Sequence, residues 1–91
     1  MARHFTGGED IEMKSTLKNF ILTVASNHQD SLEDDELLIG AGIVDSLGIL
    51  KLVSFIEEKF GIEVLDEELI PENFQTINDI SNLIKTKQKT K

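Results

Sequence analysis

The chain has 91 residues, of which 40% are hydrophobic and 29% are charged, a composition that predicts one small globular domain. Its formal net charge is −8, and positions 30–72 hold thirteen acidic residues against two lysines. Such an acidic surface argues against nucleic acid as a partner, because a phosphate backbone needs a basic counterpart. It favours proteins that carry basic docking patches.

Targeting and redox signals are few. We expect no signal peptide and no membrane insertion, since no apolar run is long enough to cross a bilayer. The absence of cysteine fits a reducing compartment, so a cytoplasmic location is expected. A solvated acidic face that only keeps a small protein in solution is the alternative interpretation of the charge.

The first helix is expected over residues 13–25, where hydrophobic residues recur at steps of three and four. Residues 1–12 contain two adjacent glycines and little pattern, so they are expected to form a flexible N-terminal extension. The expected buried stripe of this helix consists of Met13, Leu17, Phe20, Ile21 and Val24.

A long connection is expected over residues 26–44, which show no helical pattern. A loop of this length is unusual in a compact domain and indicates a functional or well-anchored segment. Gly40 and Gly42 permit a turn near its end, and residues 33–36 are expected to stay in water. The expected core anchors are Leu32, Leu37, Leu38, Ile39, Ile43 and Val44.

A second helix is expected over residues 46–60, with Asp45 or Ser46 as its N-cap and Gly61 as its stop. At about 100° per residue, five apolar side chains fall in one narrow sector and are assigned to the core. They are Ile49, Leu52, Val53, Ile56 and Phe60.

Leu47 and Leu50 fall outside that sector, one turn apart and rimmed by acidic residues. Scattered exposed apolar residues are common, so incidental exposure is one interpretation. The preferred interpretation is a docking surface for a partner protein. Its expected residues are Asp45, Leu47, Leu50, Lys51, Glu57 and Glu58.

Two further helices complete the pattern. Residues 66–69 predict a short third helix, which Pro71 cannot continue because proline lacks an N–H and clashes with the preceding turn. The last helix is expected to begin near Thr76, a suitable N-cap, and residues 87–91 are expected to form a solvated basic tail. Its expected buried stripe is Ile77, Ile80, Leu83 and Ile84.

The predicted fold is therefore all-α, with one domain over residues 13–86. It is a small four-helix bundle of three main helices and one short helix, with a long loop between helices one and two.

No catalytic constellation is apparent. A nucleophilic Ser46 needs a histidine base, and both His4 and His28 are expected to be ordinary surface imidazoles in the extension and the loop. A nucleophile elbow needs glycine at position 44, which is valine, and strands that the pattern does not predict. The acidic residues lack the ligand spacing of an EF-hand, and there is no cysteine for zinc. We expect no metal and no enzymatic activity.

Ser46 stands where an apolar loop becomes a helix, so its hydroxyl is expected to face solvent. The free N–H groups and the positive end of the helix dipole favour an attached phosphate there. Because the chain has no cysteine, any thiol chemistry must arrive on a covalently attached group. A plain N-cap role is the alternative for this serine, and its position alone favours that role.

Three segments carry a family resemblance. They are Gly-Ile-Val-Asp-Ser-Leu at 42–47, Leu-Val-Ser-Phe-Ile-Glu-Glu-Lys-Phe-Gly-Ile at 52–62 and Pro-Glu-Asn-Phe-Gln-Thr-Ile at 71–77. Together they make residues 13–84 resemble the acyl/peptidyl carrier protein family, of the stand-alone type.

The resemblance implies that Ser46 receives 4′-phosphopantetheine from coenzyme A through a phosphopantetheinyl transferase. The chain would be a monomeric phosphoprotein that performs no catalysis. It would hold acyl intermediates, of the kind used in fatty-acid and other lipid or polyketide biosynthesis, as thioesters on this arm. A loading enzyme for acyl or aminoacyl groups and downstream synthases or transferases would be its further partners.

Two positions depart from the commonest fatty-acid-synthase pattern of that family. Gly48 stands where an acidic or amide residue is usual, and Lys51 stands where glutamate is usual. A lysine there should weaken pairing with partners selected for acid. Because Gly48 resembles the D-alanyl carrier proteins, an aminoacyl or D-alanyl carrier of a specialised pathway stays an alternative. A non-catalytic helical interaction module that has lost the arm is another, motivated by the acids missing at these two positions.

Overall fold

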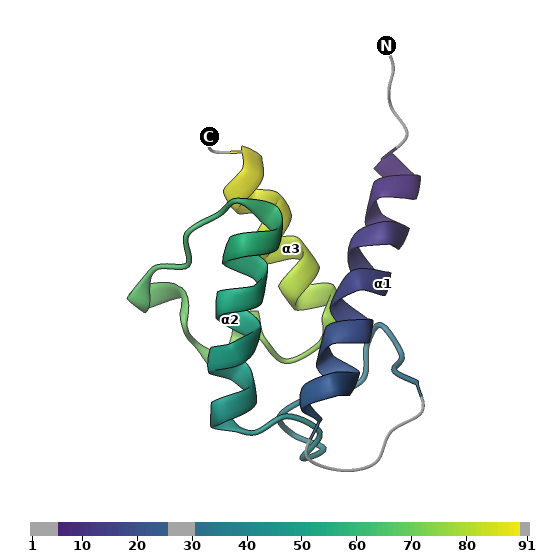
Figure 1. Cartoon of the computed structure of the whole chain (residues 1–91), viewed down its shortest axis with the longest axis vertical. Helices are drawn as coiled ribbons and strands as arrows, with labels where there is room; N and C mark the ends of the chain where they lie inside the picture. Colours follow the sequence, from purple (N-terminus) through teal and green to yellow (C-terminus); the bar gives the residue numbers. More distant parts are fainter. Residues whose placement is uncertain (1–5, 26–30, 90–91) are drawn as a thin grey trace.

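The computed structural model describes residues 6–25 and 31–89, and within these ranges the chain is helical with no strand. Its α-helices are α1 (Thr6–Val24), α2 (Ser46–Phe60) and α3 (Ile77–Lys89). Helix α1 packs against both α2 and α3 and runs opposite to them, so α2 begins at the end of the bundle where α1 finishes (Figure 1). The all-α class is confirmed. None of the described helices has the length and apolar character needed to cross a membrane.

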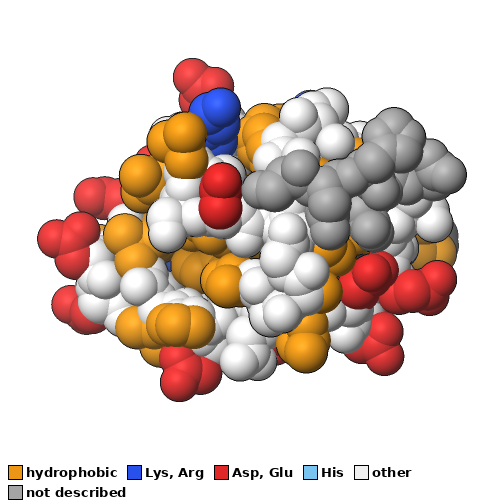
Figure 2. All heavy atoms as spheres, turned by 90° about the horizontal axis from the view of Figure 1, so that it is seen from below, with side chains coloured by type: hydrophobic (Ala, Val, Ile, Leu, Met, Phe, Trp, Pro, Cys, Tyr) orange, Lys and Arg blue, Asp and Glu red, His pale blue; other side chains and the backbone are white. Residues whose placement is uncertain are grey.

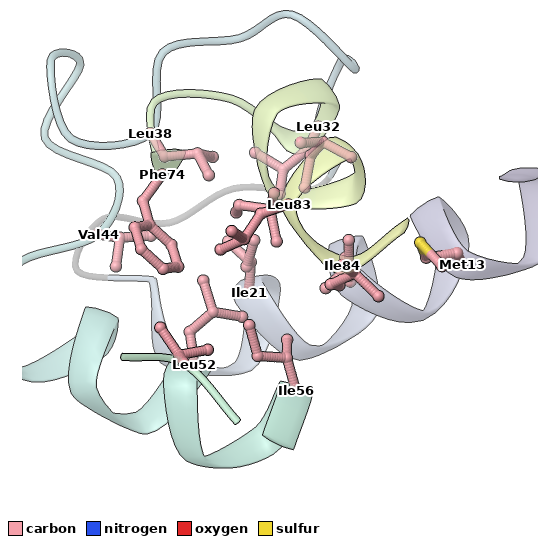
Figure 3. Packing of buried hydrophobic residues seen from close by; sticks show 14 of the residues in the cluster. Met13, Ile21, Leu32, Leu38, Val44, Leu52, Ile56, Phe74, Leu83 and Ile84 are labelled. Carbon is pink, nitrogen blue, oxygen red and sulfur yellow. The ribbon is translucent and has the colours of Figure 1, made fainter. Parts of the chain in front are cut away.

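The hydrophobic stripes of the three helices meet in one core. Met13, Leu17 and Ile21 of α1 are buried, as are Leu52 and Ile56 of α2. Figure 3 shows Met13 at one end of this cluster and Leu38, Val44 and Phe74 grouped at the other. The expected stripe of α3 is confirmed, since all four of its members are buried: Ile77, Ile80, Leu83 and Ile84.

The flanks of these stripes are only partly buried. Phe20 of α1 stacks on Phe55 of α2 with ring centroids 4.2 Å apart, which closes the edge of the α1–α2 contact. Ile49, Val53 and Phe60 also pack against the core while staying half-exposed.

The first and the last helix, α1 and α3, are both longer than expected. Helix α1 begins at Thr6 rather than at residue 13, so residues 6–12 are helical instead of forming an extension. The first turn of a helix needs no internal N–H partners, which lets the low-propensity glycines stand there. Helix α3 continues to Lys89, so residues 87–89 are helical rather than part of a tail. The flexibility expected for residues 1–5 falls outside the described residues.

The connection between α1 and α2 contains turns but no helix in its described part, residues 31–45. The prediction that Leu37 and Ile39 anchor the core is wrong, because they are 52% and 41% exposed. The N–H of Leu38 donates to the Gln75 carbonyl at 2.7 Å, and its carbonyl accepts the N–H of Ile43. These bonds turn Leu38 inward, so its two neighbours face out. Four expected anchors are buried: Leu32, Leu38, Ile43 and Val44.

The turn before α2 depends on one glycine. Gly42 has φ 75°, a left-handed conformation that favours glycine, whereas Gly40 is not in that region. Of the two expected turn glycines, only Gly42 is therefore needed for its backbone conformation.

The expected short third helix is present in a different form. Residues Asp66–Glu68 form the 3₁₀ helix η1, and Pro71–Asn73 form a second one, η2. Pro71 occupies the first turn of η2, where its missing N–H leaves no bond unmade. The bundle therefore has three α-helices and two single-turn 3₁₀ helices among its described residues, and not a fourth α-helix.

Candidate functional site

The site is built on the first turn of α2. Asp45 has extended backbone angles, and its Oδ1 accepts the N–H of Gly48 at 2.9 Å. The Asp45 carbonyl accepts the N–H of Ile49, also at 2.9 Å. Asp45 is therefore the N-cap, and the reading of Ser46 as the cap is wrong. Ser46 is the first helical residue, and its side chain is exposed.

Gly48 lies on the buried side of this turn, close to Val44. It is buried, and a Cβ placed on it would lie 2.7 Å from Cγ1 of Val44 and 3.7 Å from the carbonyl oxygen of Val24. The missing side chain therefore leaves room for Val44 beside the first turn of α2, whereas the distance to Val24 is an ordinary van der Waals contact. The sequence suggests that position 48 lacks a docking acid, but Gly48 lies in the interior. Only Lys51 changes the exposed face.

The surroundings of Ser46 suit an attached phosphate. Within the described ranges no hydrogen-bond acceptor is found for the backbone N–H groups of Ser46 and Leu47. These are orphan donors at the positive end of the helix dipole. Because Asp45 supplies the cap, the Ser46 hydroxyl is free for a covalent bond without disturbing the helix start.

A cavity of about 330 Å³ opens beside this serine, with Ser46 on its wall. It lies between α2 and the segment that contains η1 and η2. Its lining is mainly apolar and includes Ile39, Ile49, Leu50, Leu69, Ile70 and Phe74.

The sequence does not indicate where this cavity lies or which residues line it. The sequence predicts Ile39 in the core, and it gives Leu69 and Ile70 no functional role. One sequence feature could have indicated the cavity. Two apolar residues stand directly before Pro71, on a segment without the helical periodicity that would place them in the core. Leu69 and Ile70 are in fact 40% and 42% exposed.

The cavity wall is tied to α3. Glu68 Oε1 accepts the N–H of Leu65 at 2.9 Å and pairs with the Lys87 ammonium at 2.8 Å. The Asn73 side chain donates to the Glu68 carbonyl at 2.8 Å. The hydrogen bond from Lys87, followed by that from Leu65, lowers the pKa of the Glu68 carboxyl. These bonds fix the backbone that presents Leu69 and Ile70.

The structure brings five of the six expected docking residues to the surface. Leu47 and Leu50 are 60% and 59% exposed, as expected from their position outside the core sector. Glu57 is half-buried, and its Oε2 accepts the N–H of Val64 at 2.9 Å, so it also holds the loop after α2. The other exposed members are Asp45, Lys51 and Glu58. Whether these residues dock a partner stays a prediction.

Figure 2 shows the lower end of the molecule, where hydrophobic side chains gather with acidic side chains around them. No group of acidic or histidine side chains suited to a metal ion occurs within residues 6–25 and 31–89. His4 and His28 lie outside these residues.

Comparisons with known proteins identify the family of the chain. The family model "Phosphopantetheine attachment site" matches residues 15–84. The chain is 37% identical over 73 residues to an acyl carrier protein homolog of Mycoplasmopsis pulmonis, covering 80% of this chain and 97% of that protein. It is 31% identical over 70 residues to a D-alanyl carrier protein of Streptococcus suis, covering 77% and 87%.

A solved structure is similar as well. The match is to a chain in the crystal structure of an engineered Bradyrhizobium japonicum glycine:[carrier protein] ligase complexed with carrier protein from Agrobacterium tumefaciens and ATP. The TM-score is 0.69 at 26% identity, covering 81% of this chain and 97% of that chain. The prosthetic group is covalently bound 4′-phosphopantetheine. The chain belongs to the family of phosphopantetheine-binding carrier proteins.

Proposed function

We propose that Ser46 carries the 4′-phosphopantetheine arm and that the chain holds acyl groups on it as thioesters for delivery to partner enzymes. The chain itself performs no catalysis. The observation that carries the proposal is an exposed first-turn hydroxyl on the wall of an apolar cavity. The arm supplies a thiol, which the cysteine-free chain lacks.

Attachment needs little from this chain beyond presentation. The Ser46 oxygen attacks the phosphate of coenzyme A that bears the pantetheine, and the adenosine bisphosphate portion leaves. The transferase supplies the base that takes the hydroxyl proton. The resulting phosphodiester is stabilised by the orphan N–H groups of Ser46 and Leu47 and by the α2 dipole.

The cavity favours an acyl cargo. Moving each methylene out of water contributes about 0.8 kcal/mol, so four methylenes in the cavity contribute about 3 kcal/mol. The volume of about 330 Å³ lies at the low end of ligand sites. An aminoacyl group would bring a charged ammonium to a lining that is mainly aliphatic and aromatic, which disfavours its entry.

An aminoacyl cargo is the second candidate, because one similar protein is named for it and another was solved with an amino-acid ligase. One is the D-alanyl carrier protein of Streptococcus suis, and the other is the carrier complexed with a glycine ligase. In either case the proposed partners are a phosphopantetheinyl transferase, a loading enzyme and downstream synthases or transferases. We propose that the chain acts as a monomer in the cytoplasm, and that an acyl cargo places it in fatty-acid or related lipid biosynthesis.

The attachment residue is tested by incubation with coenzyme A, magnesium and a broad-specificity phosphopantetheinyl transferase, followed by intact-mass measurement. Wild type is expected to gain one arm and Ser46→Ala none. Ser54→Ala is the matched control, since Ser54 is an exposed serine on the same helix and should leave modification unchanged. Full modification of Ser46→Ala, or none of wild type by several transferases, would refute the assignment.

The cargo is tested by comparing octanoyl and D-alanyl groups on the modified protein. The octanoyl thioester is expected to react with hydroxylamine several-fold more slowly than octanoyl-pantetheine, because the cavity shelters the chain. The D-alanyl thioester is expected to show no such protection. Ile70→Asp, which places a charge on the cavity wall, should abolish the octanoyl protection. Equal reactivity of octanoyl protein and octanoyl-pantetheine would favour the aminoacyl candidate.

A further inference from the structure

Lys51 is one of two lysines in the acidic stretch of residues 30–72. It is exposed on α2, and it makes no ion pair or side-chain hydrogen bond with any residue in the described ranges. No acid stands three or four positions away on the helix, where an ion pair would form. The nearest acids along this helix are Asp45 and Glu57, each about 9 Å away along the axis, and Glu57 is engaged by the N–H of Val64. The next acid, the exposed Glu58, is about 10 Å away.

Three of the described lysines pair with acids. Lys14 and Lys18 lie 3.6 Å and 2.6 Å from the Asp34 carboxylate, and Lys87 lies 2.8 Å from Glu68. Those three lysines stabilise the fold by tying one segment to another. Lys51 ties nothing together, so its charge acts on what approaches from outside.

Lys51 lies close to the proposed attachment residue and to the exposed apolar pair of α2. It lies about 7.5 Å along the helix axis from Ser46. The exposed apolar side chains Leu47 and Leu50 stand within one turn of it. A protein that reaches the arm on Ser46 therefore meets an apolar pair, a central positive charge and outlying negative charges.

We propose that Lys51 selects the partner proteins of this carrier. The fitting partner presents an apolar depression for Leu47 and Leu50, a carboxylate opposite Lys51, and basic side chains toward Asp45 and Glu58. A partner with a uniformly basic docking surface is rejected, because like charges placed face to face oppose association. This inference rests on the proposed carrier function and adds the charge pattern of the partner.

The test uses the full chain, modified at Ser46, and a fatty-acid:carrier-protein ligase whose docking surface is uniformly basic. The probe reaction is loading of octanoate with ATP, and the measured quantity is kcat/KM. Lys51→Glu is expected to raise it about tenfold, equivalent to about 1.4 kcal/mol, and Lys51→Gln about threefold. The gain of Lys51→Glu should shrink as sodium chloride is raised, since salt screens exposed charges.

The matched control is Lys89→Glu, which changes the net charge equally. Lys89 is exposed at the end of α3, whereas Ser46 lies at the opposite end of the bundle (Figure 1). It should alter kcat/KM less than twofold. An equal gain from Lys89→Glu, or no gain from Lys51→Glu, would overturn the proposal.

Reversing a charge on the ligase tests whether the charge at position 51 acts directly on the ligase surface opposite it. Replacing the ligase's basic docking residue opposite position 51 by glutamate should raise loading of wild type and lower loading of Lys51→Glu. Additive effects in this double-mutant cycle would also overturn the proposal. Modification of every variant by coenzyme A is checked first by mass. Failure at that stage would refute the carrier function itself, whereas unchanged loading of modified protein would refute only the role of Lys51.

Discussion

The Lys87 ammonium lies 2.8 Å from Oε1 of Glu68, nineteen positions earlier in the chain. This pair joins α3 to the segment that presents Leu69 and Ile70 to the cavity. Both side chains are mostly buried, at 18% and 24% exposure, so the pair is less screened by water than a surface ion pair. The cavity beside Ser46 therefore depends on an electrostatic contact outside its lining.

Breaking that pair should loosen the cavity more than it destabilises the bundle. We expect Lys87→Met to lower the free energy of unfolding by about 1 kcal/mol, measured by urea titration. The octanoyl thioester on the modified variant should lose most of its protection from hydroxylamine. Lys89→Met, next along the same helix end but exposed, is the control and should change neither.

Two carboxyl groups should make stability fall with acid. A hydrogen bond from Lys18 lowers the pKa of Asp34 below its ordinary value of 3.8, and Lys87 does the same for Glu68 below 4.5. A carboxyl whose pKa is lower in the folded state stabilises the fold above its ordinary pKa. That contribution is lost as the pH falls through the folded-state value.

We therefore expect the urea midpoint to fall between about pH 5 and pH 3. The double variant Asp34→Asn and Glu68→Gln should show a flatter pH dependence in that window, with lower stability at pH 7. Glu63→Gln, at an exposed position, serves as the control. If the urea midpoint fell with pH equally in wild type and in the double variant, these two carboxyl groups would not cause the loss of stability.

The two faces of α2 should respond differently to truncation. Leu52→Ala removes a side chain with no exposed area and should lower the free energy of unfolding by about 2–5 kcal/mol. Leu50→Ala should lower it by no more than about 0.5 kcal/mol, because Leu50 is 59% exposed. Turnover by a partner enzyme should fall with Leu50→Ala by about fivefold, about 1 kcal/mol. Equal destabilisation by both would mean that the faces are wrongly placed.

Gly48→Ala should destabilise the start of α2 although alanine favours helices. The new Cβ would lie 2.7 Å from Cγ1 of Val44, a short and stiff side chain. We expect a net loss of about 1–2 kcal/mol after the propensity gain of about 1 kcal/mol. In a double-mutant cycle, Val44→Ala should make Gly48→Ala less harmful, and the urea midpoint measures this. Additivity of the two changes would show that the contact does not matter.

Ser81 offers a change in the opposite direction. It is fully buried in α3, and its Oγ has no hydrogen-bond partner among the described residues. An unpaired buried hydroxyl is unfavourable, so Ser81→Ala should raise the free energy of unfolding by up to about 1–2 kcal/mol. Ser54→Ala, on the exposed face of α2, should change it by no more than about 0.5 kcal/mol. A destabilised Ser81→Ala would indicate that the hydroxyl is satisfied in solution.

The regular elements were predictable because local signals agreed. For α2, the helical spacing of Leu52 and Ile56, the cap at Asp45 and the stop at Gly61 point to the same bounds, and the structure confirms them. Gly61 has φ 66°, the left-handed conformation expected past a helix end. The choice between Asp45 and Ser46 as the cap needed the structure, since both residue types cap well.

The cavity could not be read from the sequence, because its walls come from three separate segments. Ile39, Ile49 and Leu69 lie on segments held by long-range contacts, among them the Leu38–Gln75 hydrogen bond and the Glu68–Lys87 pair. The bonds of Leu38 also set which way Leu37 and Ile39 face. A segment without helical periodicity gives no such direction by itself.

The capping of α2 by Asp45 has a consequence for the order of events in the cell. Because Asp45 caps the helix and the Ser46 hydroxyl does not, we expect the chain to fold before the proposed modification of Ser46. Removal of the 4′-phosphopantetheine arm would likewise leave the helical bundle folded and Ser46 available for a second modification. We therefore expect folding and the proposed modification of Ser46 to be independent steps.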